Sequence, residues 1–198
     1  MTSIIRRVTV ALGLSLSSIL SAAAAESVYT KIDFDRCINL SSYEAGGSLH
    51  CAGHNGYGVL FKEGDLRQAV QFGHVERDDI FESFQPFNRA NETIEWRLGS
   101  NGAPYATILR WFIENTDNNG AFSPATTGEV LVVSRVGQPG KAQSCVVGYV
   151  DAKANPGAND LARRIADTMT ADFTCGTDSP VYHGTRGPLA GEPLRSIP

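Results

Sequence analysis

The sequence predicts an α+β fold: a mainly antiparallel sheet of about six to eight strands, built from hairpins, with one C-terminal amphipathic helix packed on it. Two pairs of apolar segments flank short turns that contain glycine, a pattern typical of hairpins. Segments 57–63 and 66–72 flank a glycine–aspartate turn, and segments 129–136 and 144–150 flank a turn with two glycines and a proline. One stretch shows a clear helical period, and four cysteines indicate two disulfides that hold the elements together.

The helix is predicted over residues 159–173. Its apolar side chains recur every fourth residue and form one stripe: Leu161, Ile165, Met169 and Phe173. The charged side chains beside this stripe are expected to form a face in contact with solvent: Asp160, Arg163, Arg164 and Asp167. We expect the stripe to cover a sheet that includes segments 105–113 and 130–136, because both faces of these segments are apolar.

Segment 93–98 is the cleanest strand pattern, because apolar and polar side chains alternate along it. Three of its side chains are expected to face the core: Ile94, Trp96 and Leu98. Residues 74–92, which precede it, show no regular period. We expect them to form an irregular cover over one face of the sheet, or alternatively a ligand-binding loop. The cover would be held by three aromatic side chains: Phe81, Phe84 and Phe87.

The first 25 residues have the pattern of a secretory signal peptide. Arg6 and Arg7 supply a positive start, and residues 8–20 form an apolar stretch that is too short to span a bilayer comfortably. Residues 22–25 offer small side chains for cleavage. The sequence therefore predicts a periplasmic or extracellular protein that has lost residues 1–25 and carries no membrane anchor.

Removal of the signal peptide leaves a single α+β domain at 26–176 and a flexible tail at 177–198. The tail is rich in proline and glycine and poor in apolar side chains, so it is not expected to pack firmly. Two of the 17 basic side chains lie in the signal peptide, so the remaining chain has 15 basic and 21 acidic side chains, a net charge of −6. This acidic balance argues against a nucleic-acid partner and against electrostatic docking on an anionic membrane.

The cysteines are even in number, which in a secreted chain indicates two disulfides among Cys37, Cys51, Cys145 and Cys175. Three pairings are possible, and the sequence alone does not decide among them. We favour Cys37–Cys51 and Cys145–Cys175, because each pair brackets a compact unit. The second bridge would tie the end of the helix to a strand and stabilise the fold by roughly 3–4 kcal/mol.

Two clusters contain residue types that bind metal ions. His50 and His54 would share one face of a strand and could reach one zinc or copper ion; otherwise they are solvated histidines of a surface loop. Asp117 lies in segment 115–120, which begins like a calcium loop, but Thr126 stands where such a loop has its final glutamate. Asparagine, aspartate and glycine are also common in tight turns. We expect no metal ion or other cofactor, and these three side chains are the candidates if one is bound.

No catalytic motif is apparent in the sequence. Ser100 lies in segment 99–102, which lacks the spacing of a nucleophile elbow and is expected to be a hairpin turn. No glycine-rich phosphate loop opens the predicted helix. A catalytic site assembled only in the folded chain, around His74 or His183, stays open as an alternative.

Three segments resemble an uncharacterised family of small secreted proteins of Gram-negative bacteria: 105–112 (YATILRWF), 130–133 (VLVV) and 155–167 (NPGANDLARRIAD). This resemblance spans residues 28–180 and implies a periplasmic or extracellular location. Residues 49–53 (LHCAG) are similar to the cysteine-bearing strand of periplasmic lysozyme inhibitors, which are small β-rich disulfide proteins. The chain differs from those inhibitors in its length and in its C-terminal helix.

Together these observations predict a secreted, non-catalytic protein that binds an envelope protein or a small ligand. One alternative is a secreted hydrolase whose site is not visible as a sequence motif. Another is an envelope protein that binds a metal ion through His50 and His54.

Overall fold

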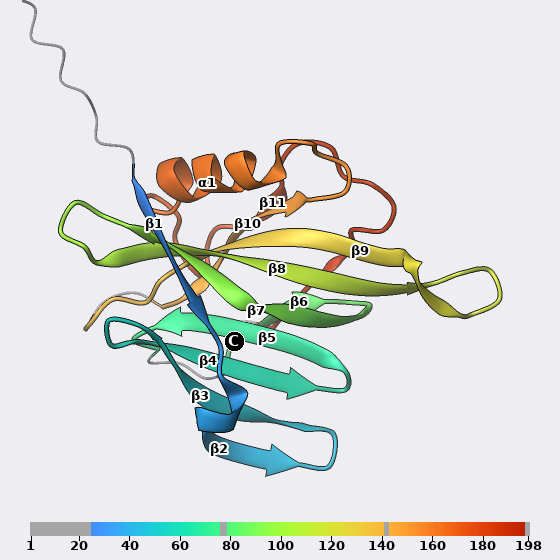
Figure 1. The fold of residues 1–198 in the computed structure, drawn as a ribbon, viewed down its shortest axis with the longest axis horizontal. Helices are drawn as coiled ribbons and strands as arrows, with labels where there is room; N and C mark the ends of the chain where they lie inside the picture. The colour runs from blue at the N-terminus through green and yellow to red at the C-terminus, as the bar shows by residue number, and fades with distance from the viewer. Residues whose placement is uncertain (1–24, 76–78, 141–142, 197–198) are drawn as a thin grey trace, which may run out of the picture.

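The computed structural model describes residues 25–75, 79–140 and 143–196, so residues 1–24 of the predicted signal peptide lie outside the described residues. Within these ranges twelve strands form three sheets, and one α-helix lies on the largest of them (Figure 1). Strands account for 56% and helices for 9% of the described structure. The chain is therefore predominantly β, and the predicted α+β class fits it only loosely.

The largest sheet has six strands in the order β1-β7-β8-β9-β10-β11. Neighbouring strands are antiparallel, except that β10 and β11 are parallel. β8 and β9 are long and extend beyond the rest of the sheet as an arm, at the right of Figure 1. The strands are β1 (Glu26–Lys31), β7 (Phe87–Leu98), β8 (Pro104–Thr116), β9 (Phe122–Arg135), β10 (Cys145–Asp151) and β11 (Val181–Tyr182).

The two smaller sheets lie on the opposite side of this sheet from the helix (Figure 1). A short 3-10 turn, η1 (Phe34–Arg36), leads into the first of them. The predicted hairpins at 57–72 and 129–150 are confirmed as β4–β5 and β9–β10. The four-stranded sheet consists of β2 (Ile38–Tyr43), β3 (Gly46–His54), β4 (Tyr57–Gly64) and β5 (Arg67–Gly73), and the two-stranded sheet of β6 (Phe81–Phe84) and β12 (Pro193–Ser196).

The main core lies between the six-stranded and the four-stranded sheets. Trp96 of β7 is fully buried there, and its ring centroid lies 5.8 Å from that of Phe72 of β5. Its indole Nε1 donates a hydrogen bond to Thr30 Oγ1 at 2.7 Å. Ile94 and Leu98 are buried with it, which confirms the predicted alternation. Burial of an aromatic side chain of this size is worth roughly 4–6 kcal/mol, so Trp96 strongly couples the two sheets.

The helix α1 (Ala158–Met169) covers the other face of the six-stranded sheet (Figure 1). It packs on apolar side chains of β8, β9 and β10, as the sequence predicts. Leu161 and Met169 of the predicted stripe are only partly buried, and Phe173 packs beyond the end of the helix. Small side chains let the helix approach the sheet closely, so its buried residues are Ala158, Ala162, Ile165 and Ala166.

The predicted charged face on α1 is solvated only in part: Asp167 is exposed and Arg163 is half-buried, but both also form ion pairs with β7 that the sequence does not predict. Arg97 of β7 donates to both carboxylate oxygens of Asp167, at 2.9 and 2.7 Å. Arg163 Nε donates to Glu95 Oε1 at 2.7 Å. Glu95 and Arg97 are only 7% and 5% exposed. Strand alternation places them on the helix side of β7, where buried charges need partners of opposite sign, and α1 supplies those partners.

Both disulfides have the pairing that the sequence favours. Cys37 and Cys51 are bonded with a Cα–Cα distance of 4.4 Å, and Cys145 and Cys175 with one of 5.8 Å. The first bridge joins the start of β2 to β3, and the second ties the segment after α1 to the start of β10. The predicted link between the helix end and a strand is thereby confirmed.

Part of the segment predicted to be irregular is regular in the structure. Residues 81–84 form β6, and β7 begins at Phe87 with a bulge between Ala90 and Ile94. Phe84 is buried, with its ring centroid 5.8 Å from that of Trp111. The first residues of β7 show no regular alternation of apolar and polar side chains, so their pairing with β8 leaves no periodic signal in the sequence.

Residues 177–196, for which the sequence predicts a flexible tail, follow a defined course in the structure. β11 extends the six-stranded sheet, and β12 pairs with β6. Tyr182 Oη donates to the backbone oxygen of Ala190 at 2.6 Å, and Arg195 Nε donates to Glu82 Oε1 at 2.9 Å. Ala190 and Glu82 are both buried. A few contacts therefore hold this segment in place, although its composition, rich in proline and glycine and poor in apolar side chains, predicts a flexible tail.

The two buried glutamates have pKa values that are shifted in opposite directions. Burial raises the pKa of Glu82 above its ordinary value, although the nearby Arg195 acts to lower it. Burial also acts to raise the pKa of Glu95, but hydrogen bonds from Arg163 and Ser27 outweigh burial, and this pKa lies below its ordinary value. The two carboxyl groups should therefore affect stability at different pH.

We expect Glu82→Gln and Glu95→Gln to change the pH dependence of unfolding in opposite ways. The Glu95 contribution is lost as the pH falls below about 4.3, because the unfolded state then takes up a proton that the native state excludes. For Glu82, stability is lost as the pH rises above about 4.3, because the unfolded state then releases a proton that the native state keeps. Urea denaturation from about pH 3 to 7 measures both slopes. Variants with parallel pH profiles would contradict these assignments.

Candidate functional site

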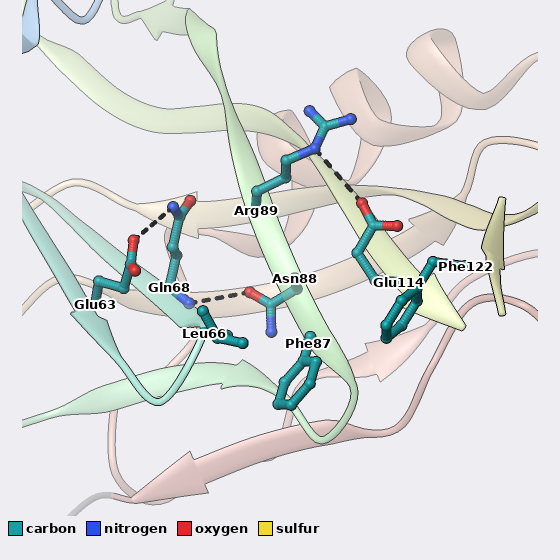
Figure 2. A pocket seen from close by; sticks show the side chains of 8 residues that line it. All are labelled: Glu63, Leu66, Gln68, Phe87, Asn88, Arg89, Glu114 and Phe122. Atoms are coloured by element: carbon teal, nitrogen blue, oxygen red, sulfur yellow. Dashed lines mark hydrogen bonds and ion pairs between the residues drawn. The ribbon is translucent and has the colours of Figure 1, made fainter. Parts of the chain in front are cut away.

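A groove lies where the β4–β5 turn, the start of β7 and the arm formed by the far ends of β8 and β9 meet (Figure 2). It has a volume of about 410 Å³, and we call it the arm groove. A second hollow of about 300 Å³ shares Phe87, Glu114 and Phe122 with it and continues along the arm. The lining of the arm groove consists of Glu63, Leu66, Gln68, Phe87, Asn88, Arg89, Glu114 and Phe122.

Three apolar side chains from three separate elements lie in a row along this groove: Leu66, Phe87 and Phe122 (Figure 2). Leu66 is 59% exposed and Phe122 is 55% exposed. The ring centroids of Phe87 and Phe122 are 6.4 Å apart. The guanidinium carbon of Arg67 lies 4.9 Å from the Phe87 centroid, which fixes one side of that ring by a cation–π contact. The groove therefore offers a partly ordered apolar surface to solvent.

The turn between β4 and β5 holds Leu66 in an unfavourable backbone conformation. Its two central residues, Asp65 and Leu66, have φ of 50° and 59°. Turns with two positive φ angles favour asparagine, aspartate and glycine, and an ordinary side chain in the left-handed region costs roughly 1–2 kcal/mol. The sequence suggests a turn at Gly64-Asp65, whereas in the structure the turn lies one residue later. This shift brings a leucine to the tip of the hairpin.

The floor of the groove is built by one buried amide. Asn88 Oδ1 accepts a hydrogen bond from the backbone N–H of Gln68 at 3.1 Å, and Asn88 Nδ2 donates to the backbone oxygen of Pro86 at 2.9 Å. Gln68 Oε1 in turn accepts from the backbone N–H of Ala90 at 2.7 Å. These bonds connect β5 to β7, so the groove is already formed before anything occupies it.

Most charges at the rim of the groove are paired within the chain. Arg89 Nε lies 3.5 Å from Glu114 Oε1, and Arg67 donates to Asp65 Oδ2 at 2.6 Å. Glu63 differs, because its carboxylate accepts a hydrogen bond only from the neutral amide of Gln68, at 3.0 Å, among the contacts of the described residues. The ion pairs found in those residues do not include Glu63. The groove therefore carries one carboxylate that no cation neutralises there.

The two histidines considered for a metal site do not share a face. A bulge between Cys51 and His54 breaks the alternation of β3. The ring of His50 lies over Gly58 on the exposed side, since a Cβ on that glycine would meet His50 Nε2 at 2.5 Å. The ring of His54 lies 6.2 Å from that of the buried Trp96. Within the described ranges, no three histidine, cysteine or acidic side chains are grouped as metal ligands.

Asp117 closes the tip of the arm. Its Oδ1 accepts hydrogen bonds from the backbone N–H groups of Asn119 and Ala121, at 2.8 and 2.9 Å. The hydrogen bonds from Ala121 and Asn119 hold the pKa of Asp117 below its ordinary value. The side chain therefore acts as a turn former, which accounts for the resemblance of this segment to the start of a calcium loop.

The other two histidines lie in separate parts of the fold. The His74 ring packs edge-on against that of Tyr57, with centroids 5.1 Å apart. His183 follows β11 and lies over Gly148 of β10, and burial lowers its pKa. Ser100, considered for a nucleophile, lies in the turn between β7 and β8, as the sequence predicts.

The arm groove is not predicted from the sequence, although the sequence contains one usable signal for it. Leu66 directly follows a Gly-Asp pair, and Phe122 follows shortly after Gly120. Large apolar side chains beside turn residues are unusual, because turns are exposed and favour polar residues. What the sequence does not show is that Leu66 and Phe122 line the same groove.

Comparison with known proteins gives no relative for this chain: no protein-family model, no curated protein and no solved structure matches it. In the described part of the chain, no helix combines the length and apolar character needed to cross a membrane. The geometry of the arm groove is therefore the basis for a functional hypothesis.

Replacing Leu66 with glycine should stabilise the fold. The change relieves the left-handed strain, and the extra entropy of glycine in the unfolded chain offsets part of the gain, so we expect about 0.5–1 kcal/mol in the free energy of unfolding. Leu40 of β2 is a matched control, because it is similarly exposed (55%) but has no positive φ. Leu40→Gly should destabilise the chain by a similar amount. Chemical denaturation of both variants measures the contrast, and a loss of stability in Leu66→Gly would show that the turn is not strained.

Proposed function

We propose that this chain is a secreted, non-catalytic binding protein that takes a segment of a polypeptide partner into the arm groove. The observation that carries the proposal is Leu66, an exposed leucine kept at a position where glycine or asparagine would be more stable. Strain that a protein retains at an exposed site is a reason to look for a function there. Leu66 lies at the rim of a preformed apolar groove, which is the kind of place where a binding residue is needed.

The groove chemistry indicates which segment would fit. Its volume of about 410 Å³ suits one or two large side chains, and its apolar row of Leu66, Phe87 and Phe122 favours leucine, methionine or an aromatic residue. The carboxylate of Glu63 favours a lysine or arginine beside that anchor. We therefore expect the partner segment to combine an apolar anchor with an adjacent basic side chain.

The groove lining supports binding rather than catalysis by a serine, threonine, cysteine or histidine side chain. The eight side chains that line it include no hydroxyl, thiol or imidazole group. A secreted location is supported by the signal-peptide pattern of residues 1–25, and the two disulfides are compatible with an oxidising compartment. An envelope or extracellular polypeptide is therefore the partner class that we propose.

Selection from a random peptide display library tests this proposal. The bait is the chain produced from its full sequence, exported, and purified with both disulfides formed. We expect enriched peptides to share a large apolar residue next to lysine or arginine. A synthetic peptide of the enriched sequence should bind at least about tenfold more weakly to Phe122→Ser and to Leu66→Gly, as measured by fluorescence anisotropy.

Two further variants make the result specific. Glu63→Gln should weaken binding several-fold and reduce its dependence on salt, because it removes the unpaired carboxylate. Leu40→Ser, which changes an exposed leucine of β2 that does not line the groove, should leave the affinity unchanged. A selection without enrichment, or peptides that bind all of these variants equally well, would rule out the arm groove as the binding site.

A further inference from the structure

The strand β2 forms a free edge of the four-stranded sheet. All six of its side chains are exposed. Ile38 is 64% exposed and Leu40 is 55% exposed, and Tyr43 at the end of the strand is similarly open to solvent. A free edge presents unpaired backbone N–H and C=O groups that can pair with another strand. β2 combines this open backbone with apolar side chains.

The chain protects the edge strand β1 with charged side chains, whereas β2 has none and is interrupted only by a bulge at Leu40, between Asn39 and Ser41. β1, at the edge of the six-stranded sheet, carries Glu26 and Lys31, and Lys31 forms an ion pair with Glu92 at 2.9 Å. Charged side chains on an edge strand oppose pairing with a further strand. The sequence of β2, INLSSY, contains no charged residue and no proline. A second strand can therefore approach β2 without repulsion, although the chain as a whole is acidic.

The free edge is also held rigidly. The Cys37–Cys51 disulfide fixes the start of β2 to β3. Ser41 and Ser48 share a hydrogen bond of 2.7 Å across the same two strands, and Tyr43 Oη donates to the backbone oxygen of Glu63 at 2.9 Å. A strand that is ordered in advance loses little conformational entropy when another strand pairs with it.

We propose that β2 pairs with β2 of a second copy of this chain, antiparallel and across a two-fold axis. The two four-stranded sheets would then form one continuous sheet of eight strands. A bulge at Leu40, between Asn39 and Ser41, places Ile38, Ser41 and Tyr43 on one face of β2. In the symmetric register, Ile38 of each copy faces Tyr43 of the other, and the two Ser41 residues face each other at the two-fold axis. An aliphatic side chain opposite an aromatic one is a favourable cross-strand pair.

Charges just outside the strand favour this same register. Arg36 precedes β2 and Glu44 follows it, and both are exposed. The ion pairs of the described residues include neither of them. In the two-fold arrangement, Arg36 of one copy lies next to Glu44 of the second copy, and the symmetry repeats the pair at the other end. Because a two-fold axis matches the patch with itself, a second copy is the partner whose charges complement both ends.

The contact is small, so the dimer should be weak. A six-residue edge with its flanking charges buries less than the roughly 1,200 Å² at the lower limit of a standard interface. We expect a dissociation constant in the micromolar range. Sedimentation velocity of the exported, oxidised chain at concentrations up to about 200 µM should therefore show a monomer–dimer equilibrium.

Substitutions identify the surface that carries the association. Leu40→Lys places a charge on the edge and should weaken the dimer at least about tenfold, while Leu66→Lys, at the equally exposed leucine of the arm groove, should leave it unchanged. Thermal unfolding of each variant shows that it is folded. A chain that stays monomeric at about 200 µM, or a dimer that is insensitive to Leu40→Lys, overturns the proposal.

A charge exchange tests the two-fold register. Arg36→Glu and Glu44→Arg should each weaken the dimer several-fold, because each replaces two attractive contacts with two repulsive ones. The double variant should restore the dissociation constant to within about twofold of that of the unchanged chain. If the single effects simply add in the double variant, the two residues do not face each other and the register is wrong. Capture of a foreign peptide strand by β2 in a monomeric chain would also exclude a second copy as the occupant.

Discussion

The buried charge pairs between β7 and α1 are the interaction on which the rest of the structure depends. Strand alternation places Glu95 and Arg97 on one face of β7 and Trp96 on the other. One face of β7 therefore needs a charged partner and the other face an apolar partner. A buried charge that loses its partner costs roughly 3–5 kcal/mol. The helix and the four-stranded sheet therefore have to lie on opposite sides of β7, and this fixes the order of the layers.

Local signals account for the part of the fold that the sequence predicts. The alternation at 93–98, the pairing of strands in the two hairpins and the compact units bracketed by cysteines each lie within a few tens of residues, and each is confirmed. The failures concern distant partners. Arg163 has the pattern of a solvated helix residue because Glu95 is 68 positions away in the chain. The arm groove is not predicted for the same reason, because its lining comes from three hairpin segments that only the tertiary structure brings together.

The arm groove and β2 use exposed apolar side chains in different ways. In the groove, side chains from separate elements surround a hollow, so it selects the shape and charge of what enters. In β2, the backbone itself is the contacting surface, so it selects a strand in one register. Both are fixed in advance, the groove by the hydrogen bonds of Asn88 and β2 by the Cys37–Cys51 bridge. Strain at Leu66 lowers the stability of the chain, and the exposed apolar side chains of β2 lower its solubility. Both regions are nevertheless held in place by bonds within the chain.

The contact between Arg195 and Glu82 has a consequence for the time course of folding. The two residues are 113 positions apart, and Glu82 is buried. Until residue 195 has been synthesised, the chain cannot supply the cation that this carboxylate faces in the finished protein, nor the strand that pairs with β6. Contacts over such a separation slow folding. A chain that is still being made therefore lacks the contacts that complete this part of the fold.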